Sequence, residues 1–175
     1  MVGWKRPKSV DFPSVWSTFE GKKNVGGGKR KYWIQDLSEE YKDEVVEHMI
    51  NNFINDEPLT RCSKIAQDPE SFEGFRSLWK DVVDQNMSLI CLTKDEDGVT
   101  HLAGCNVLTV AQKDDHDQVY QGRGIQIVLG ILSDVSHLKD VFSEINSDTY
   151  LSALGLYVLP EYRGEGVAVE LLNAR

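Results

Sequence analysis

The sequence lacks any long hydrophobic run. Its longest apolar stretch, Ile125 to Leu132, is interrupted by Gln126 and Gly130. A membrane-spanning helix needs about 20 consecutive apolar residues, so this stretch is too short to span a bilayer. The first residues also lack the charged-then-apolar pattern of a secretory leader. We therefore expect a cytoplasmic protein with no membrane partner.

Cysteine and histidine are scarce and scattered. Cys62, Cys91 and Cys105 are odd in number and have no paired metal-ligand spacing. Cys91 and Cys105 lie in apolar, strand-like runs, where a buried and reduced thiol is the usual outcome. The histidines show no helical two-histidine spacing; they are His48, His101, His116 and His137. We expect no metal site.

Positive charge is rare outside the first 35 residues. That segment holds eight Lys and Arg and two Asp and Glu, or +6, so with a net charge of −9 the rest carries −15. Such an acidic body is a poor nucleic-acid binder. It also repels anionic ligands at long range, so an anion would have to be bound by local contacts. The basic head, with Lys5-Arg6-Pro7-Lys8 and Gly26-Gly27-Gly28, predicts a loosely ordered extension over residues 1–30.

The most informative segment present is the one from Leu156 to Ala168. An apolar strand runs into Pro160 and Arg163, then two glycines, and a helical pattern starts at once. A strand, glycine turn and helix start aim several backbone N–H groups at one point, which suits an anion. Glycine lets the anion approach the backbone and permits positive φ. The segment therefore predicts a binding site for a phosphate-bearing ligand, with an ordinary strand-to-helix turn as the alternative.

Two common nucleotide motifs fit this turn badly. A Walker A loop would need Lys after the second glycine, and a Rossmann fingerprint would need glycine where Val169 stands. The pattern Arg/Gln-x-x-Gly-x-Gly/Ala does fit, filled by Arg163, Gly166 and Ala168. The segment resembles the acetyl-CoA pyrophosphate loop of the GCN5-related N-acetyltransferases (GNAT).

Hydrophobic periodicity predicts the order of elements before this turn. We expect strands and helices at residues 31–35 (strand), 38–55 (helix, capped by Asp36 or Ser38), 69–82 (helix, capped by Asp68), 88–93 and 99–110 (hairpin), 136–145 (helix) and 149–158 (strand). Gly122-Arg123-Gly124 predicts a turn. Gly155 lies inside the last strand and suggests a bulge.

A second segment narrows the resemblance from the GNAT superfamily to one of its families. Asn55-Asp56-Glu57-Pro58-Leu59, directly after the first helix, looks like the insect arylalkylamine N-acetyltransferase family, which includes dopamine acetyltransferases. The likeness runs from about Tyr32 to Arg175 and implies an α+β (α/β) GNAT fold, a mixed central sheet flanked by helices. Residues 31–175 would form that domain. The sequence ends inside a helical pattern, so we expect the domain to lack its C-terminal part.

The resemblance also implies roles for individual residues. Glu57 would be the general base, with a solvated loop carboxylate or a helix-terminating acid as the alternative interpretation. Asp56 is expected to turn or cap the chain. Tyr157 also suits a cross-strand aromatic, and the Glu165 side chain is expected in solvent. Backbone groups at the end of the 149–158 strand would hold the pantetheine arm of CoA, and backbone groups of the glycine turn would hold its pyrophosphate. The cofactor-binding residues of the strand are Leu156, Tyr157 and Val158, and those of the turn are Arg163, Gly164, Glu165, Gly166, Val167 and Ala168.

The function implied is acetyl-CoA-dependent N-acetyl transfer to a small primary amine, an arylalkylamine by resemblance. Two alternatives stay open. One changes the acceptor to a polyamine, an amino acid or a protein amine. The other is a CoA-binding module without catalysis. The natural amine and the oligomeric state cannot be read from the sequence.

Overall fold

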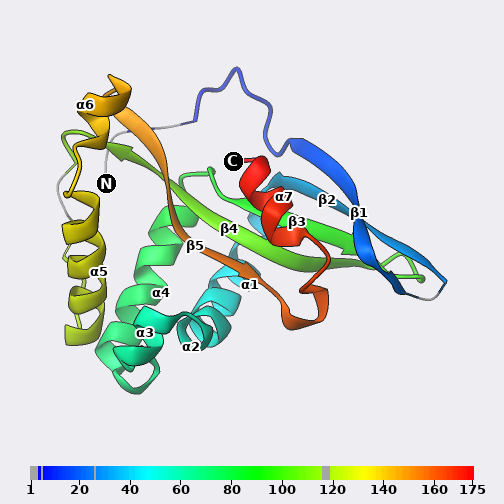
Figure 1. The fold of residues 1–175 in the computed structure, drawn as a ribbon, viewed down its shortest axis with the longest axis horizontal. Coiled ribbons are helices and arrows are strands. Elements are labelled where there is room, and N and C mark those ends of the chain that lie inside the picture. Colours follow the sequence, from blue (N-terminus) through cyan, green and yellow to red (C-terminus); the bar gives the residue numbers. More distant parts are fainter. Residues whose placement is uncertain (1–3, 5, 26, 116–118) are drawn as a thin grey trace.

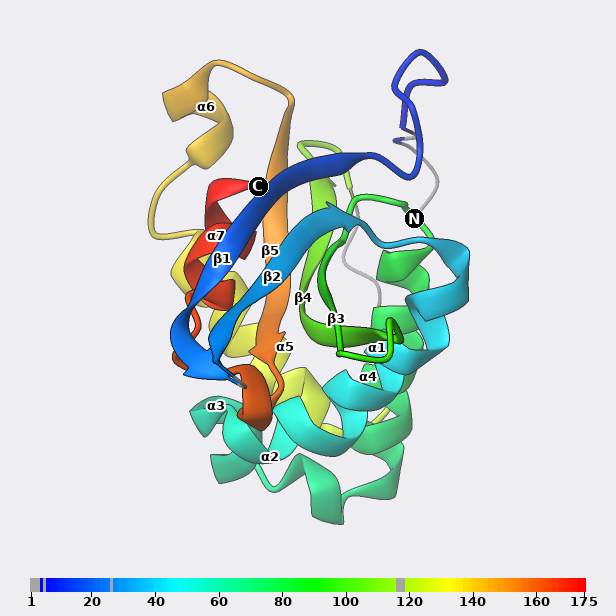
Figure 2. The ribbon, with the colours of Figure 1, turned by 90° about the vertical axis from the view of Figure 1, so that its right-hand side faces the viewer.

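The chain folds into a curled sheet between two helical layers of unequal size (Figure 1). The computed structural model describes residue 4 and residues 6–25, 27–115 and 119–175. Lys5 and Gly26 of the basic head and residues 116–118 of the polar loop, with His116, lie outside the described residues. The helices between residues 42 and 136 pack against one face of the sheet, and the helix over residues 167–173 lies on the other (Figures 1 and 2).

The sheet has the strand order β1-β2-β3-β4-β5 in the described part of the chain. The strands are β1 (Val15–Val25), β2 (Gly28–Asp36), β3 (Leu89–Lys94), β4 (Thr100–Gln112) and β5 (Thr149–Val158). The predicted α+β class is confirmed, and so is the β3–β4 hairpin. The sheet was expected to be mixed, but all four neighbouring pairs are antiparallel. Short hairpins join β1 to β2 and β3 to β4, and such connections are possible only between antiparallel strands.

The helices are mostly where the apolar periodicity predicts them. They are α1 (Lys42–His48), α2 (Ile54–Asp56), α3 (Pro58–Cys62), α4 (Pro69–Val83), α5 (Arg123–Ser136), α6 (Val141–Ile145) and α7 (Val167–Asn173). A π-helical segment, Met49–Phe53, joins α1 to α2, so the expected first helix is continuous up to Asp56. Asp68 caps α4 by accepting from the Ser71 N–H, as predicted.

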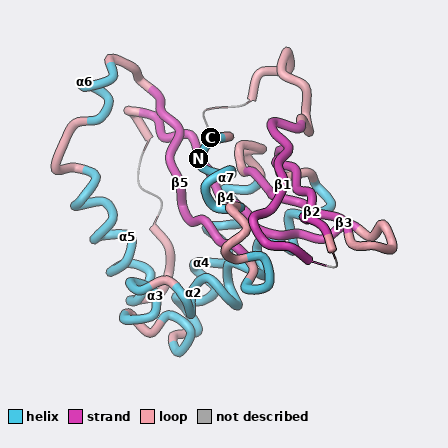
Figure 3. The backbone as a smooth tube through the Cα atoms, turned by 45° about the vertical axis from the view of Figure 1, so that its right-hand side comes forward, coloured by secondary structure: helices cyan, strands magenta, loops and turns pink. Residues whose placement is uncertain are grey.

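Residues 15–25 were predicted to be loosely ordered, and this is wrong. They form β1, which pairs with β2 at both ends and has a bulge between Glu20 and Asn24 (Figure 3). Asp36, expected as a helix cap, is instead buried and bonded to the Arg6 guanidinium (2.8 Å), the Ser14 N–H and the Trp16 indole. These bonds fix the N-terminal segment to the start of the helical region.

The helix predicted over residues 136–145 is present only in its second half, and the longer helix before it was missed. The structure has α5 from Arg123, ending at Ser136, and then the short α6. Gly122-Arg123-Gly124 is therefore a helix start rather than a turn. The N–H groups of Gly124 and Ile125 donate to Asp68 Oδ2 (3.3 Å) and Ser71 Oγ (3.0 Å) of α4. The caps of α5 are thus supplied by side chains more than fifty residues earlier.

Two apolar clusters fill the space between the layers. The larger joins the sheet to α1, α4 and α5 and contains Met49, Trp79 and Tyr157. The smaller lies under α7 and contains Tyr32 and Tyr162. No helix in the described ranges combines the length and hydrophobicity that crossing a bilayer would require.

Candidate active site

One cavity of about 810 Å³ lies where β1, the α2–α3 junction and the end of β5 meet. This volume is within the range of about 300–1,000 Å³ typical of small-molecule sites. The residues that line the cavity are Lys22, Phe53, Asp56, Glu57, Leu156, Tyr157, Val158, Tyr162, Arg163, Gly164, Gly166, Val167, Ala168 and Val169. Both segments singled out in the sequence therefore contribute to a single cavity.

The end of β5 forms one wall of this cavity. Leu156, Tyr157 and Val158 pair with β4 on their inner side, opposite Asn106, Cys105 and Gly104. β5 is one of the two edge strands of the described sheet. The register shifts at Gly155, whose φ is +138°, so the predicted bulge is present. An edge strand offers its outer N–H and C=O groups to an extended ligand, as pantetheine is expected to be.

The glycine turn continues this wall from β5 into α7. Gly164 and Gly166 have φ of +81° and +97°, values that side chains other than glycine rarely adopt. Gly166 is the residue that precedes the first turn of α7, and no side chain caps it. The N–H groups at the start of α7 are thus left for solvent or a ligand. Gly164, Gly166, Val167 and Ala168 all line the cavity.

Glu57 stands at the junction of α2 and α3. Its carboxylate accepts from the N–H groups of Leu59 (2.9 Å) and Thr60 (2.6 Å), so it caps α3. Each carboxylate oxygen has about two lone-pair sites, and one backbone N–H on each leaves capacity for water or an amine. Glu57 also lines the cavity, so the helix-terminating role and the proposed chemical role are compatible.

Arg163 connects the two halves of the site. Its guanidinium donates to Val158 O (2.9 Å) and to Asp56 Oδ2 (2.6 Å) and lies over the Tyr157 ring. The hydrogen bond to Asp56 raises the pKa of Arg163. Burial raises the pKa of the Tyr157 hydroxyl, and the Arg163 charge opposes this. Asp56 was expected to turn or cap the chain; instead it forms the ion pair that joins the helical region to the glycine turn.

Glu165 was expected to point into solvent, and this is wrong. The residue is 1% exposed. Its carboxylate lies against β1 and accepts from the Lys23 N–H (3.0 Å). β1, which was not anticipated, covers this side of the turn. Glu165 is absent from the residues that line the cavity, unlike the other eight predicted cofactor-binding residues.

Comparison with solved structures gives the family. A protein of the yellow fever mosquito Aedes aegypti, assigned as arylalkylamine N-acetyltransferase 7, is 34% identical to the chain, with a TM-score of 0.90. The match covers 99% of this chain and 72% of the mosquito protein. The chain belongs to the arylalkylamine N-acetyltransferase family. Its members have the GNAT fold and are acyltransferase enzymes, as the two sequence motifs predict.

More distant structures agree with this N-acetyltransferase fold. Arylalkylamine N-acetyltransferase 2 of Aedes aegypti is 20% identical with a TM-score of 0.66, covering 81% of this chain and 67% of that one. An agmatine N-acetyltransferase is 14% identical with a TM-score of 0.61 and the same two coverages. At these identities the likeness shows the fold alone. No protein-family model and no curated protein matches the sequence.

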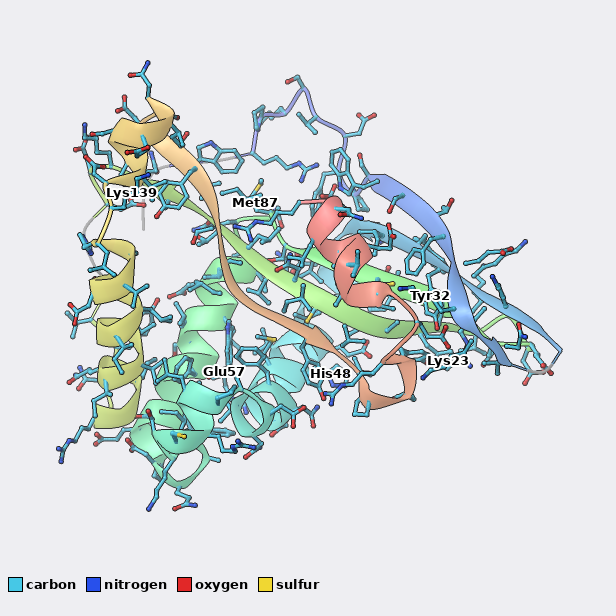
Figure 4. All side chains as sticks on the ribbon, in the orientation of Figure 1. Lys23, Tyr32, His48, Glu57, Met87 and Lys139 are labelled. Carbon is cyan, nitrogen blue, oxygen red and sulfur yellow. The ribbon has the colours of Figure 1, made fainter. Side chains whose placement is uncertain are left out.

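Two lysines of this N-acetyltransferase chain were missed as site residues. Lys22 lines the cavity, and Lys23 donates through its ammonium to Arg163 O (2.5 Å). Figure 4 shows Lys23 on the β1 side of the turn and Glu57 in the helical layer. The signal was available in the basic head, which holds Gly21-Lys22-Lys23, but it was interpreted as a tail. No cluster of three metal-ligating side chains is found in residues 4, 6–25, 27–115 and 119–175.

Proposed function

We propose that this protein transfers the acetyl group of acetyl-CoA to a small primary amine, an arylalkylamine, with Glu57 as the general base. One observation carries the proposal: Glu57 and eight of the nine predicted cofactor-binding residues line the same cavity. The family membership supplies the reaction class, and the edge of β5 with the glycine turn suits an extended thioester ligand that ends in phosphates. All three described cysteines are free, which fits the expected cytoplasmic location.

The reaction takes place between two ends of the cavity: Glu57 lies at the amine end, and the end of β5 with the glycine turn forms the end for acetyl-CoA. A primary amine is protonated at neutral pH, since its pKa is about 10, and must lose a proton before it can attack. Glu57 takes that proton, directly or through water. The amine nitrogen then bonds to the thioester carbonyl carbon and the carbon–sulfur bond breaks; the nitrogen loses its second surplus proton, which passes through solvent to the leaving thiolate and gives free CoA and the amide. The acetyl donor supplies the activated carbonyl; the protein orients both partners.

The acidic side chains suit the amine. Asp56 and Glu57 are the carboxylates that line the cavity; Asp56 is paired with Arg163, so Glu57 is the one that can face the amine, and Phe53 and Tyr157 provide aromatic surface beside it. A cationic amine with an aromatic group would meet both features. This pairing of charge and aromatic surface favours an arylalkylamine over an amino acid, whose own carboxylate would be repelled.

Two variants test the role of Glu57. Glu57→Gln keeps one oxygen, which can accept from one of the two α3 N–H groups, but its amide cannot take a proton. We expect kcat to fall by about 100-fold or more, with acetyl-CoA affinity within about twofold of wild type. Asp68→Asn is the matched control, because Asp68 caps α4 before a proline in the same way and lies outside the cavity. It should keep the wild-type rate. Wild-type turnover by Glu57→Gln would remove Glu57 from the mechanism.

The function itself is tested by turnover with acetyl-CoA and a panel of amines. Arylalkylamines should give the highest kcat/KM. Preference for a polyamine, an amino acid or a protein amine would overturn the acceptor class. Binding of acetyl-CoA without transfer to any amine would overturn the enzymatic proposal.

A further inference from the structure

β1 is fixed to the glycine turn by three contacts. The Lys23 N–H donates to Glu165 Oε2 (3.0 Å), and the Lys23 ammonium donates to Arg163 O. The third contact is at Gly21, where the β1 backbone lies so near the Glu165 carboxylate that a Cβ on Gly21 would be only 2.4 Å from Glu165 Oε2. β1 and the turn therefore hold one another in a defined position, although about 140 residues separate them in sequence.

Lys22 stands between these contacts and faces the cavity. Its Cε is 3.4 Å from the position that a Cβ on Gly166 would take. The ammonium nitrogen lies one C–N bond, about 1.45 Å, beyond Cε. The nitrogen itself lies more than 4 Å from that position, so the side chain touches the turn through Cε and the ammonium projects beyond it, next to the cavity that Lys22 lines. Within the described ranges, neither a carboxylate nor a carbonyl forms a hydrogen bond or ion pair with this ammonium.

Two cations line the cavity, Lys22 and Arg163, and of these Lys22 is the one without a hydrogen-bond or ion-pair partner in the described part of the chain. The guanidinium of Arg163 is already bonded to Asp56 and to Val158 O. The molecule as a whole carries −9 and so offers no long-range attraction to an anion. An unpaired ammonium beside glycines with exposed N–H groups points to an anionic ligand group at this place.

We propose that Lys22 binds the diphosphate of acetyl-CoA, donating from its ammonium to a diphosphate oxygen, and that Lys23 holds β1 in position for this contact. The inference rests on the proposed function and assigns a side chain to its anion site. The diphosphate is chosen over the 3′-phosphate because Lys22 lies at Gly166, whose neighbouring N–H groups would bind the same group.

Calorimetry with acetyl-CoA and with its 3′-dephospho form tests this assignment. Lys22→Gln should raise the Kd for both esters by about five- to tenfold, as expected for losing one charge-assisted hydrogen bond in a partly exposed site. Lys22→Arg should stay within about twofold of wild type. Lys29→Gln is the matched control: it removes one exposed charge from the same hairpin, away from the cavity, and should change neither Kd.

The outcomes are distinguishable. An unchanged Kd in Lys22→Gln while wild type binds would overturn this inference alone. Weaker binding of acetyl-CoA but not of the dephospho form would assign Lys22 to the 3′-phosphate and overturn the diphosphate contact. If wild type binds neither ester, the proposed function fails and this inference fails with it. A further readout is salt: the Kd of wild type should rise more steeply with ionic strength than that of Lys22→Gln.

Discussion

Asp56 and Glu57 are neighbours in the chain, but at the scale of single residues their partners differ. Glu57 bonds within its own helix start, whereas Asp56 reaches the glycine turn through Arg163. Both side chains of the pair are about half exposed, 52% for Asp56 and 48% for Arg163. Exposed pairs contribute about 0.2–1 kcal/mol, so this one should adjust the position of Glu57 rather than hold the fold together.

A double-mutant cycle tests this positioning role. Asp56→Asn and Arg163→Gln should each lower kcat by about two- to fivefold, because the end of α2, directly before Glu57, loses its ion pair with the turn. The double variant should lose little more than either single one, since both remove the same contact. Unfolding temperatures should stay close to wild type. Fully additive losses in kcat would show that the two residues act separately.

The three cysteines provide a second residue-scale test. Cys62 is exposed on α3, while Cys91 and Cys105 are buried. Burial raises the pKa of the Cys91 thiol, and it raises that of Cys105 to about 12. Since the thiolate is the reactive form, a thiol reagent at pH 8 should modify Cys62 quickly and the other two only after unfolding. Cys62→Ser should abolish the fast phase; rapid reaction of a second thiol in the folded protein would contradict the burial.

At the scale of elements, β1 depends on one missing side chain. A Cβ on Gly21 would lie 2.4 Å from Glu165 Oε2 and 2.9 Å from the Tyr32 ring. Gly21→Ala should therefore push β1 away from the turn, lower the free energy of unfolding by about 1–3 kcal/mol and weaken acetyl-CoA binding. Gly28→Ala is the matched control, because nothing lies within 4 Å of the added carbon. Chemical denaturation and calorimetry measure both effects, and equal stability of the two variants would contradict this account of β1.

The elements that could be predicted are those whose signals are local. Asp68-Pro69 announces α4 because the cap and the first helical residue are adjacent, and the glycine turn is recognisable for the same reason. β1 has no such signal: Gly21 is its one buried residue, and charged side chains interrupt the apolar alternation. α5 begins after Gly122 without a side-chain cap of its own, since Asp68 and Ser71 of α4 serve that role. Tertiary partners of this kind cannot be found by a local pattern.

The same distinction applies to the site. Glu57 and the β5–α7 turn carry recognisable motifs, so their residues were found from the sequence. Lys22 and Lys23 act through their position beside a turn that follows about 140 residues later. The buried Glu165 was assigned to solvent for that reason: its partner, the Lys23 N–H, belongs to a strand that the charge pattern concealed.

At the scale of the whole molecule, the cavity is built from three parts of the chain: β1, the α2–α3 junction and the β5–α7 segment. A ligand that fills it contacts all three and therefore favours the folded state over the unfolded one. At about 100 times its Kd, acetyl-CoA should add about 2.7 kcal/mol to the free energy of unfolding. For a chain of 175 residues this corresponds to a rise in Tm of roughly 5–11 °C. Scanning calorimetry with and without acetyl-CoA measures the shift. Acetyl-pantetheine is the matched control, because it has the thioester arm but no phosphates. It should give a much smaller rise in Tm at the same concentration, since it leaves the glycine turn and β1 without a ligand. Equal shifts for the two compounds would show that the turn and β1 take no part in binding.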